Sequence, residues 1–424
     1  MIRYINLLKE AGVNEFQIVD TFEESSEMFF VKKKLDMRRM KNVEKIVIAI
    51  YKEMEEDGKK LKGRADVIGN PYMSDEEWTD KIKAALFSAG FVKNPTYSLP
   101  PVNKSEKVVV KSDISGMKLI DIADKFVEAV YSQDTDDKAF INSLEVFAVR
   151  KTVRVVDSNG SDVSYEKTSF SGEFVAQCKE PEDVETYQNF EYDSLALDEI
   201  KSLVQRTLSM TRDRAVATKM PDTGNYDVVI SHRYVTELFK LYFMRANTAY
   251  VFAKYSDYKV GDKIQGEDVK GDLLNVELVA EAPFDDDAIS KVDRSFIEDG
   301  VLKTLHGGVR FSEYIGAQKI GFYTKGRVKA GSVSMKEMLN RPCIHIVNFS
   351  DFQMDPFDGH FKGEIRLGYL YDGKGNVEIV TGGAVNGSMF EAQKNLTLSS
   401  ETQKLSDYEG PVAILLKDVS IAGK

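Results

Sequence analysis

Short apolar runs and amphipathic segments alternate along the first part of the chain. In the segment 15–70, the apolar runs at 28–31 and 47–51 are brief and separated by polar residues and glycines, which favours β-strands joined by turns. Ser74 and Glu77 have the spacing of a capping box, and the apolar residues after them recur at helical intervals. The pattern therefore predicts strands followed by a helix that begins at Ser74.

Two more helices and a hairpin are predicted in the rest of the N-terminal half. Residues 119–130 are amphipathic, and apolar residues line one side of a helix over roughly 195–215. Between them, the segment 143–180 surrounds an Asn-Gly pair at 159–160, which favours the positive φ of a tight turn. The proline-containing stretch 94–112 shows no periodicity and predicts a loop.

The pattern changes after the turn-rich segment 221–225. One helix is predicted at 232–245, and short strands with Gly/Asp turns follow it. The strand candidates are 274–281, 342–349, 364–371 and 376–381. We therefore predict an α+β fold of two lobes: residues 1–218 form an N-terminal α/β lobe of mixed strands with packed helices, and residues 219–424 form a mostly antiparallel, barrel-like β lobe with a few helices.

Composition agrees with an ordinary globular chain. A length of 424 residues favours two domains, and 42% hydrophobic with 29% charged residues is typical of soluble proteins. No apolar stretch approaches the ~20 residues that span a bilayer, and the N-terminus does not resemble a signal peptide. Two cysteines cannot provide a disulfide framework for a chain of this size. We expect a cytoplasmic protein with no membrane association.

Charge argues against a nucleic-acid partner. The formal net charge is -11, whereas neutralising phosphates requires a basic field. The one basic cluster, at 32–34 and 38–39, lies close to several glutamates and is interpreted as a solvated strand face or turn. An acidic run at 285–287 is likewise interpreted as a solvated turn rather than a cation site.

Glycine- and acid-containing motifs follow one another through the C-terminal half. They are a strand at 226–231 with the helix after it, then 284–287, 296–302, 355–361, 368–370 and 382–387. Each is only a strand with a Gly/Asp turn, but their joint order and spacing are specific. This order resembles the TldD/PmbA family, also called TldD/TldE, over roughly residues 140–424. Members of that family are described as zinc metalloproteases that trim or mature peptides, and an older label for them is modulators of DNA gyrase.

The resemblance suggests substrate-loop candidates. The family pattern "N-P-x-T-G-x-F-S" corresponds to the segment around Pro356, where the candidates are Asp355, Asp358, Gly359 and Phe361. Asp355 replaces the family's asparagine, and the residue after Phe361 is lysine rather than serine. The loop therefore departs from the family pattern at both ends.

The helix after the first strand of the C-terminal half decides between the two branches of the family. In the TldD branch this helix carries H-E-x-x-x-H, whose histidines bind zinc and whose glutamate polarises the attacking water. Here the segment 231–242 contains one histidine, His232, and Glu237 follows five residues later. Five residues turn a helix by roughly 500°, so these side chains are expected to diverge by about 140°. The sequence thus resembles the PmbA/TldE branch, for which we expect no catalytic residue and no metal in this chain.

Other histidines leave one alternative metal site open. Cys343 and His345 are two apart on a predicted strand and share a face, so with His306 or His360 they could bind zinc. A buried cysteine beside a tucked histidine is the favoured interpretation.

Three functional hypotheses follow. In the first, the chain is a non-catalytic PmbA/TldE-like subunit that completes a peptide chamber with a zinc-bearing TldD-like homologue and forms a homodimer in isolation, as the resemblance implies. In the second, it is an independent metal-dependent peptidase that uses the non-standard site. In the third, it is a regulatory binding protein of the gyrase-modulator type. The first is preferred, because family-like order occurs here without the zinc motif.

Overall fold

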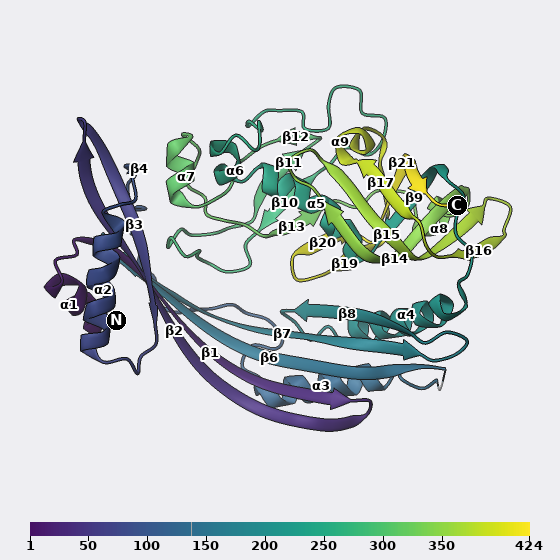
Figure 1. The fold of residues 1–424 in the computed structure, drawn as a ribbon, viewed down its shortest axis with the longest axis horizontal. Coiled ribbons are helices and arrows are strands. Elements are labelled where there is room, and N and C mark those ends of the chain that lie inside the picture. The colour runs from purple at the N-terminus through teal and green to yellow at the C-terminus, as the bar shows by residue number, and fades with distance from the viewer. Residues whose placement is uncertain (137) are drawn as a thin grey trace.

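The computed structural model describes residues 1–136 and 138–424, which form a long curved sheet with a second, β-rich lobe above it (Figure 1). The N-terminal lobe contains, in chain order, α1 (Ile2–Glu10), β1 (Glu15–Val31), β2 (Lys34–Glu56), β3 (Lys59–Gly69), α2 (Asp75–Ala89), β4 (Asn94–Pro95), β5 (Val108–Val109), α3 (Leu119–Tyr131), β6 (Ala139–Asp157), β7 (Asp162–Cys178), β8 (Val184–Tyr192) and α4 (Leu197–Val216). Its strands make one sheet of order β4-β3-β2-β1-β6-β7-β5, and β8 also pairs with β7.

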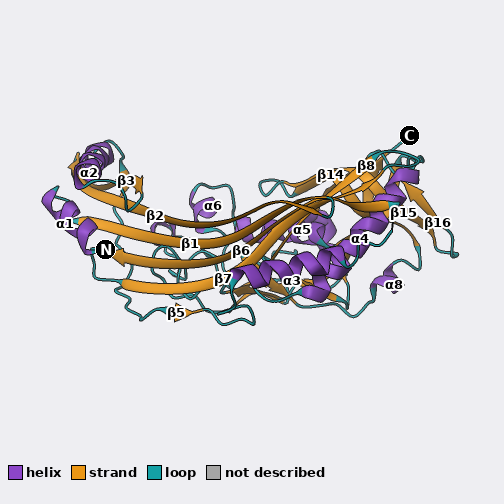
Figure 2. Cartoon of the chain, turned by 90° about the horizontal axis from the view of Figure 1, so that it is seen from below, coloured by secondary structure: helices purple, strands orange, loops and turns teal. Residues whose placement is uncertain are grey.

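Long antiparallel hairpins build this sheet. β1 pairs with β2 from Glu15↔Tyr51 to Val31↔Lys34, and β6 pairs with β7 along almost its whole length. Alternation gives the sheet two different faces. Even-numbered positions of β1, such as Ile18 and Met28, enter two cores, one covered by α1 and α2 and the other by α3 and α4. The two helix pairs lie at opposite ends of the sheet (Figure 2).

The opposite face of the sheet points toward the C-terminal lobe. Odd-numbered positions of β1 and β6 lie on this face, and many of them are polar or charged, such as Glu23 and Lys151. An apolar contact joins the lobes where Val153 and Val155 pack against Phe284 and Ala288. The sheet therefore presents a largely hydrophilic surface to the second lobe, and small apolar clusters, this one among them, join the two lobes.

The C-terminal lobe is a closed barrel extended by a second sheet. Its elements are β9 (Gly224–Ser231), α5 (Arg233–Arg245), α6 (Thr248–Phe252), β10 (Val276–Val279), β11 (Arg294–Glu298), β12 (Val301–Leu302), α7 (Val309–Tyr314), β13 (Lys325–Val328), α8 (Met335–Met338), β14 (Pro342–Met354), β15 (His360–Asp372), β16 (Val377–Val380), β17 (Ala384–Ser388), α9 (Met389–Ala392), the 3-10 helix η1 (Gln393–Asn395), β18 (Thr397–Leu398), β19 (Thr402–Lys404), β20 (Tyr408–Pro411) and β21 (Ala413–Ala422). The order β14-β9-β21-β17-β15 closes because β14 and β15 also pair.

The barrel and the second sheet share one core with α5. Val235, Leu238 and Tyr242 on the inner side of α5 are buried with residues of both sheets. The second sheet has the order β12-β11-β10-β13-β20-β19. The predicted α+β class and the barrel-like C-terminal lobe are confirmed. In the described part of the chain, no helix has both the length and the apolar character needed to cross a membrane.

The acidic run 285–287 is not merely a solvated turn, which corrects the sequence interpretation. The Asp285 carboxylate accepts hydrogen bonds from the backbone N–H groups of Asp287, Ile289 and Phe322 at 3.0, 2.9 and 3.2 Å. Asp287 accepts a bond from the N–H of Val309 at the start of α7, at 2.9 Å. Both carboxylates therefore satisfy backbone donors that would otherwise lack partners.

Gly172 of β7 lies at a point where the structure leaves no room for a side chain. A Cβ at this position would lie 2.5 Å from the carbonyl oxygen of Glu145 and 2.5 Å from the ring of Phe190. We expect Gly172→Ala to lower the free energy of unfolding by about 1–3 kcal/mol, as overpacking does. Gly224→Ala is the control, because its Cβ would meet nothing closer than 3.7 Å and should change stability by less than about 1 kcal/mol. Chemical denaturation measures both, and equal effects would contradict the packing argument.

Candidate functional site

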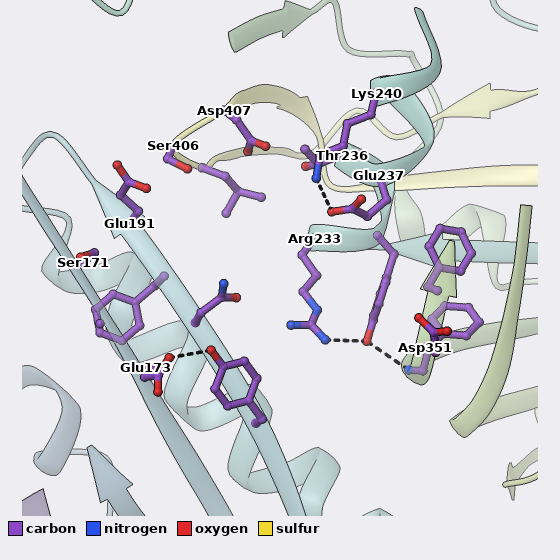
Figure 3. A pocket seen from close by; sticks show the side chains of 18 of the residues that line it. Ser171, Glu173, Glu191, Arg233, Thr236, Glu237, Lys240, Asp351, Ser406 and Asp407 are labelled. Carbon is purple, nitrogen blue, oxygen red and sulfur yellow. Dashed lines mark hydrogen bonds and ion pairs between the residues drawn. The ribbon is translucent and has the colours of Figure 1, made fainter. Parts of the chain in front are cut away.

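A cavity of about 610 Å³ lies between the two lobes (Figure 3). One wall comes from β6, β7 and β8 of the long sheet. The other comes from α5, from residues 349–352 of β14, and from residues 405–407 between β19 and β20. The site is therefore assembled from segments that are far apart in the sequence. We refer to it as the inter-lobe cavity.

Helix α5 contributes five residues to this cavity, and all but Tyr234 lie on one side of the helix. Arg233, Thr236, Glu237 and Lys240 are spaced i, i+3, i+4 and i+7, so they share one helical face. The opposite face is buried in the core of the C-terminal lobe. The amphipathic pattern that makes this segment a helix thus also determines which residues face the cavity.

The positive side chains of α5 are held by neighbours. Arg233 Nη2 donates to the hydroxyl of Tyr234 at 3.0 Å, and the backbone N–H of Phe349 donates to the same oxygen at 3.0 Å. Lys240 Nζ donates to Glu237 Oε1 at 2.7 Å, which neutralises that pair. Figure 3 shows both interactions.

Acidic side chains predominate in the lining. The carboxylates are Glu173, Glu191, Glu237, Asp351 and Asp407, and the cations are Arg233 and Lys240. These seven residues give the cavity a formal charge of about -3 at neutral pH. On the sheet side, the Tyr187 hydroxyl donates to Glu173 at 2.7 Å. The cavity is therefore electrostatically suited to a cationic group.

Two of these carboxylates, Asp407 and Glu191, have a raised pKa, because their surroundings disfavour the charged form. Burial is the main cause that raises the pKa of Asp407, and the negative charges of Glu237 and Glu281 add to it, while Lys240 acts in the opposite sense. Burial also raises the pKa of Glu191; Lys167 acts in the opposite sense, and Asp407 is among the negative charges that add to the effect of burial. The two residues lie on opposite walls of the cavity (Figure 3). A cation placed between them would relieve both effects.

A second cavity, of about 380 Å³, adjoins the first and shares Thr236, Lys240 and Asp407 with it. Aromatic and other apolar side chains make up much of the rest of its lining, so we call it the aromatic cavity. These side chains are Phe239, Phe243, Met244, Tyr250, Phe322, Tyr323 and Tyr408. His306 also lines it. Burial lowers the pKa of His306 to about 4, so this ring is neutral at physiological pH.

Comparison with known proteins places the chain in a family. Residues 111–216 match the family model for the PmbA/TldA metallopeptidase central domain. Residues 223–423 match the model for the PmbA/TldA metallopeptidase C-terminal domain. Together the two matches span more than two thirds of the chain. The chain belongs to the PmbA/TldA metallopeptidase family.

Solved structures of this family's fold extend over the whole chain. TldE from Thermococcus kodakarensis has 16% identity and a TM-score of 0.77, over 99% of this chain and 100% of that one. A protein described as a modulator of a DNA gyrase, from Thermotoga maritima, has 15% identity and a TM-score of 0.78, over 99% of each chain. A protein with a similar description from Bacteroides thetaiotaomicron has 14% identity and a TM-score of 0.76. A search of curated proteins found no match.

His232, the one histidine of the segment 231–242, does not line the inter-lobe cavity. His232 precedes α5 at φ 58°, so the angular estimate for two helical residues does not apply to it. It lines a neighbouring space beside Arg206, which shares Arg233 and Tyr234 with the inter-lobe cavity, whereas Glu237 lines the inter-lobe cavity itself. Burial lowers the pKa of His232 well below its usual range. The turn before the helix thus separates the two side chains.

Cys343 and His345 lie inside the C-terminal lobe. His345 is buried, its Nε2 is 2.9 Å from the Ser231 hydroxyl, and burial lowers its pKa to about 4. Burial raises the pKa of the Cys343 thiol to about 11, and its Sγ lies 3.9 Å from the Met338 carbonyl oxygen. Within residues 1–136 and 138–424, no group of three or more His, Cys, Asp or Glu side chains has a metal-binding arrangement.

The remaining candidates lie at the turn between β14 and β15. Asp355 and Asp358 each accept a bond from a backbone N–H two residues later, at 2.8 and 2.9 Å. His360 is exposed, with its Nδ1 3.3 Å from Asp358. Gly359 has φ 73°, and Phe361 is fully buried in the core. None of these five residues lines the inter-lobe cavity or the aromatic cavity.

Sequence reasoning missed the residues that do form the cavity. Glu191 lies next to the last residue of β8, Asp407 lies in a short turn, and Thr236 is an ordinary helical residue. No motif connects them, because they come together only through the packing of one lobe on the other. The alternation of polar residues along β7 and β8 was the only signal, and it indicates a solvated face without naming a partner.

Asp407→Asn should show the effect of the buried charge on stability. Because the folded-state pKa of Asp407 is raised above its ordinary value of 3.8, the ionised form destabilises the fold at neutral pH. We expect the variant to unfold at a temperature higher by roughly 1–3 °C near neutral pH, and to lose this advantage as the pH falls through the raised pKa toward 3.8.

Asp358→Asn provides a control of opposite sign. The N–H of His360 lowers the pKa of Asp358, so its ionised form stabilises the fold. This variant should be slightly less stable at neutral pH and equal to the parent in acid. The unfolding temperatures of both variants, measured at neutral pH and in acid, test these two expectations. A stabilised Asp358→Asn together with a destabilised Asp407→Asn would contradict the direction of both pKa shifts.

Proposed function

We propose that this chain is a PmbA/TldE-like subunit of a TldD/TldE-type metalloprotease that acts in peptide proteolysis or maturation, and that it contributes no catalytic residue. The observation that carries this proposal is the set of residues on the cavity face of α5. By resemblance, this helix holds the zinc ligands in the TldD branch. Here the corresponding face presents Arg233, Thr236, Glu237 and Lys240.

Such a face is chemically unsuited to zinc. A guanidinium and an ammonium group repel a dication and offer it no lone pair. The one carboxylate on this face, Glu237, is engaged by Lys240 at 2.7 Å. The imidazoles of His232 and His306 line other spaces, and His345 is buried against Ser231.

In this proposal a TldD-like homologue supplies the zinc ion and the activated water. The present chain supplies a wall of the chamber into which the peptide enters, and in isolation it forms a homodimer. We further propose that it acts in the cytoplasm. The family membership and the match to the TldE fold support the choice of partner.

The decisive experiment reconstitutes the two-subunit enzyme. The isolated chain should contain clearly less than one zinc per protein and should not cleave unfolded peptides. A complex with a zinc-bearing TldD-like homologue should cleave them, and a chelator should abolish the activity. Altering the partner's H-E-x-x-x-H should have the same effect as the chelator.

Variants of this chain separate the proposal from an independent peptidase. Cys343→Ala and His360→Gln remove two candidate ligands, one buried and one exposed. Each should leave the activity of the complex within about twofold, whereas removing a true metal ligand or its support costs at least 10–100-fold. Stoichiometric zinc in the isolated chain, with chelator-sensitive cleavage that either variant abolishes, would favour the independent enzyme.

A further inference from the structure

The inter-lobe cavity and the aromatic cavity meet at Thr236. Its side chain lines both spaces and is only 7% exposed. Among the residues that the structure describes, none forms a hydrogen bond with its hydroxyl oxygen. The oxygen itself is closed off from solvent, so Thr236 separates the two spaces without offering its hydroxyl to either of them. Thr236 thus lies at the boundary between an acidic space and an apolar one.

The acidic space has carboxylates on two opposing walls. Glu191 belongs to the sheet, and Asp407 belongs to the turn between β19 and β20. The nearby ammonium of Lys240 is already paired with Glu237. A cationic side chain entering between the lobes would therefore meet two carboxylates at once, and charge-assisted hydrogen bonds are among the stronger polar contacts.

The adjoining space suits an apolar side chain. Phe243, Phe322 and Tyr323 surround it, and Phe322 is 45% exposed. The His306 ring that completes this wall is fixed in one tautomer, because its Nδ1 accepts the N–H of Tyr323 while its Nε2 lies 3.0 Å from the carbonyl oxygen of Phe243. Covering these rings with an apolar group would remove apolar surface from water.

We propose that the two cavities together bind an extended peptide segment in which a lysine or arginine is adjacent to an aromatic or other large apolar residue. The basic side chain lies between Glu191 and Asp407, and the apolar one enters the aromatic cavity. The peptide group between them passes over Thr236. This inference rests on the proposed role in peptide handling and names the class of peptide that the subunit selects.

Binding of short fluorescent peptides to the full chain tests this inference. The probe is a capped peptide, Gly-Ser-Lys-Phe-Ser-Gly, and its analogues carry norleucine for lysine, alanine for phenylalanine, or the two residues in reversed order. Norleucine keeps the length of the lysine side chain without its charge. By fluorescence anisotropy, one of the two orders of lysine and phenylalanine should bind about tenfold or more tightly than its norleucine analogue. It should also bind more tightly than its alanine analogue.

Variants of the protein locate the binding. Asp407→Asn and Glu191→Gln should each weaken binding of the lysine peptide by about tenfold and leave the norleucine peptide unchanged. Thr236→Val keeps the shape of the side chain and should change the affinity for either peptide by less than about threefold, because the Thr236 oxygen is closed off from both cavities. Glu267→Gln is the control, because this carboxylate is exposed, pairs with Lys263 and lines neither cavity. It should change nothing.

Several results would overturn the inference. The first is an equal affinity for the lysine and norleucine peptides. The second is an equal loss of affinity for all peptides in the two carboxylate variants, and the third is that no peptide binds. Both carboxylate variants are isosteric and lie on different walls, so if one fails to fold the other still provides the test. A complex with the zinc-bearing partner that cleaves peptides without any basic-aromatic preference would remove this inference alone. Failure to form that complex, with the preference intact, would instead remove the proposed function.

Discussion

The hydroxyl of Tyr234 fixes the first turn of α5, and the geometry of both cavities depends on that turn. It accepts the backbone N–H of Phe349 and the guanidinium of Arg233, each at 3.0 Å. The ring packs edge-on against Phe349, with the centroids 4.7 Å apart. A buried N–H that loses its acceptor costs about 1–3 kcal/mol, so this oxygen joins the helix to β14 firmly.

The backbone before the helix is equally constrained. His232 adopts φ 58°, an unusual value for a residue with a side chain. Its N–H bonds to the Val412 carbonyl at 2.8 Å, and its own carbonyl accepts Gln403 at 2.9 Å. With the inner face of α5 in the core, the helix cannot rotate to bring other residues to the cavity. The four residues on its outer face are therefore a fixed property of the wall.

Local chemistry made much of the fold predictable. The capping box of Ser74 and Glu77 is present with both reciprocal bonds, and the helices predicted at 119–130 and 195–215 correspond to α3 and α4. Such signals depend on neighbours in the sequence. The length of β2 was not predictable. The strand continues through the highly charged and exposed segment 34–45, where its pairing with β1 maintains it and burial does not. The helix α1 was also missed.

The candidate site was less predictable for a related reason. The sequence drew attention to histidines and to the Gly/Asp loop at 355–361, since those residue types have recognised chemistry. The structure shows the loop organised by its own Asx turns and His345 sealed in the lobe. Glu191 and Asp407 gained their role from lobe packing, which brings together positions more than 200 residues apart. No local pattern encodes that contact.

The acidic residues of the inter-lobe cavity and the residues that α5 presents to it together determine the charge that a ligand would meet. A net charge of -11 spread over 424 residues says little about ligands, because exposed charges are screened within about 10 Å. Inside the cavity, screening is weaker, and burial raises the pKa of Glu191 and Asp407. A zinc ion held here would draw such carboxylates in as ligands and cancel their charge. Because α5 instead presents Arg233 and a Lys240 already paired with Glu237, this helix offers a zinc ion no free carboxylate or imidazole, and Glu191 and Asp407 face the space between the lobes.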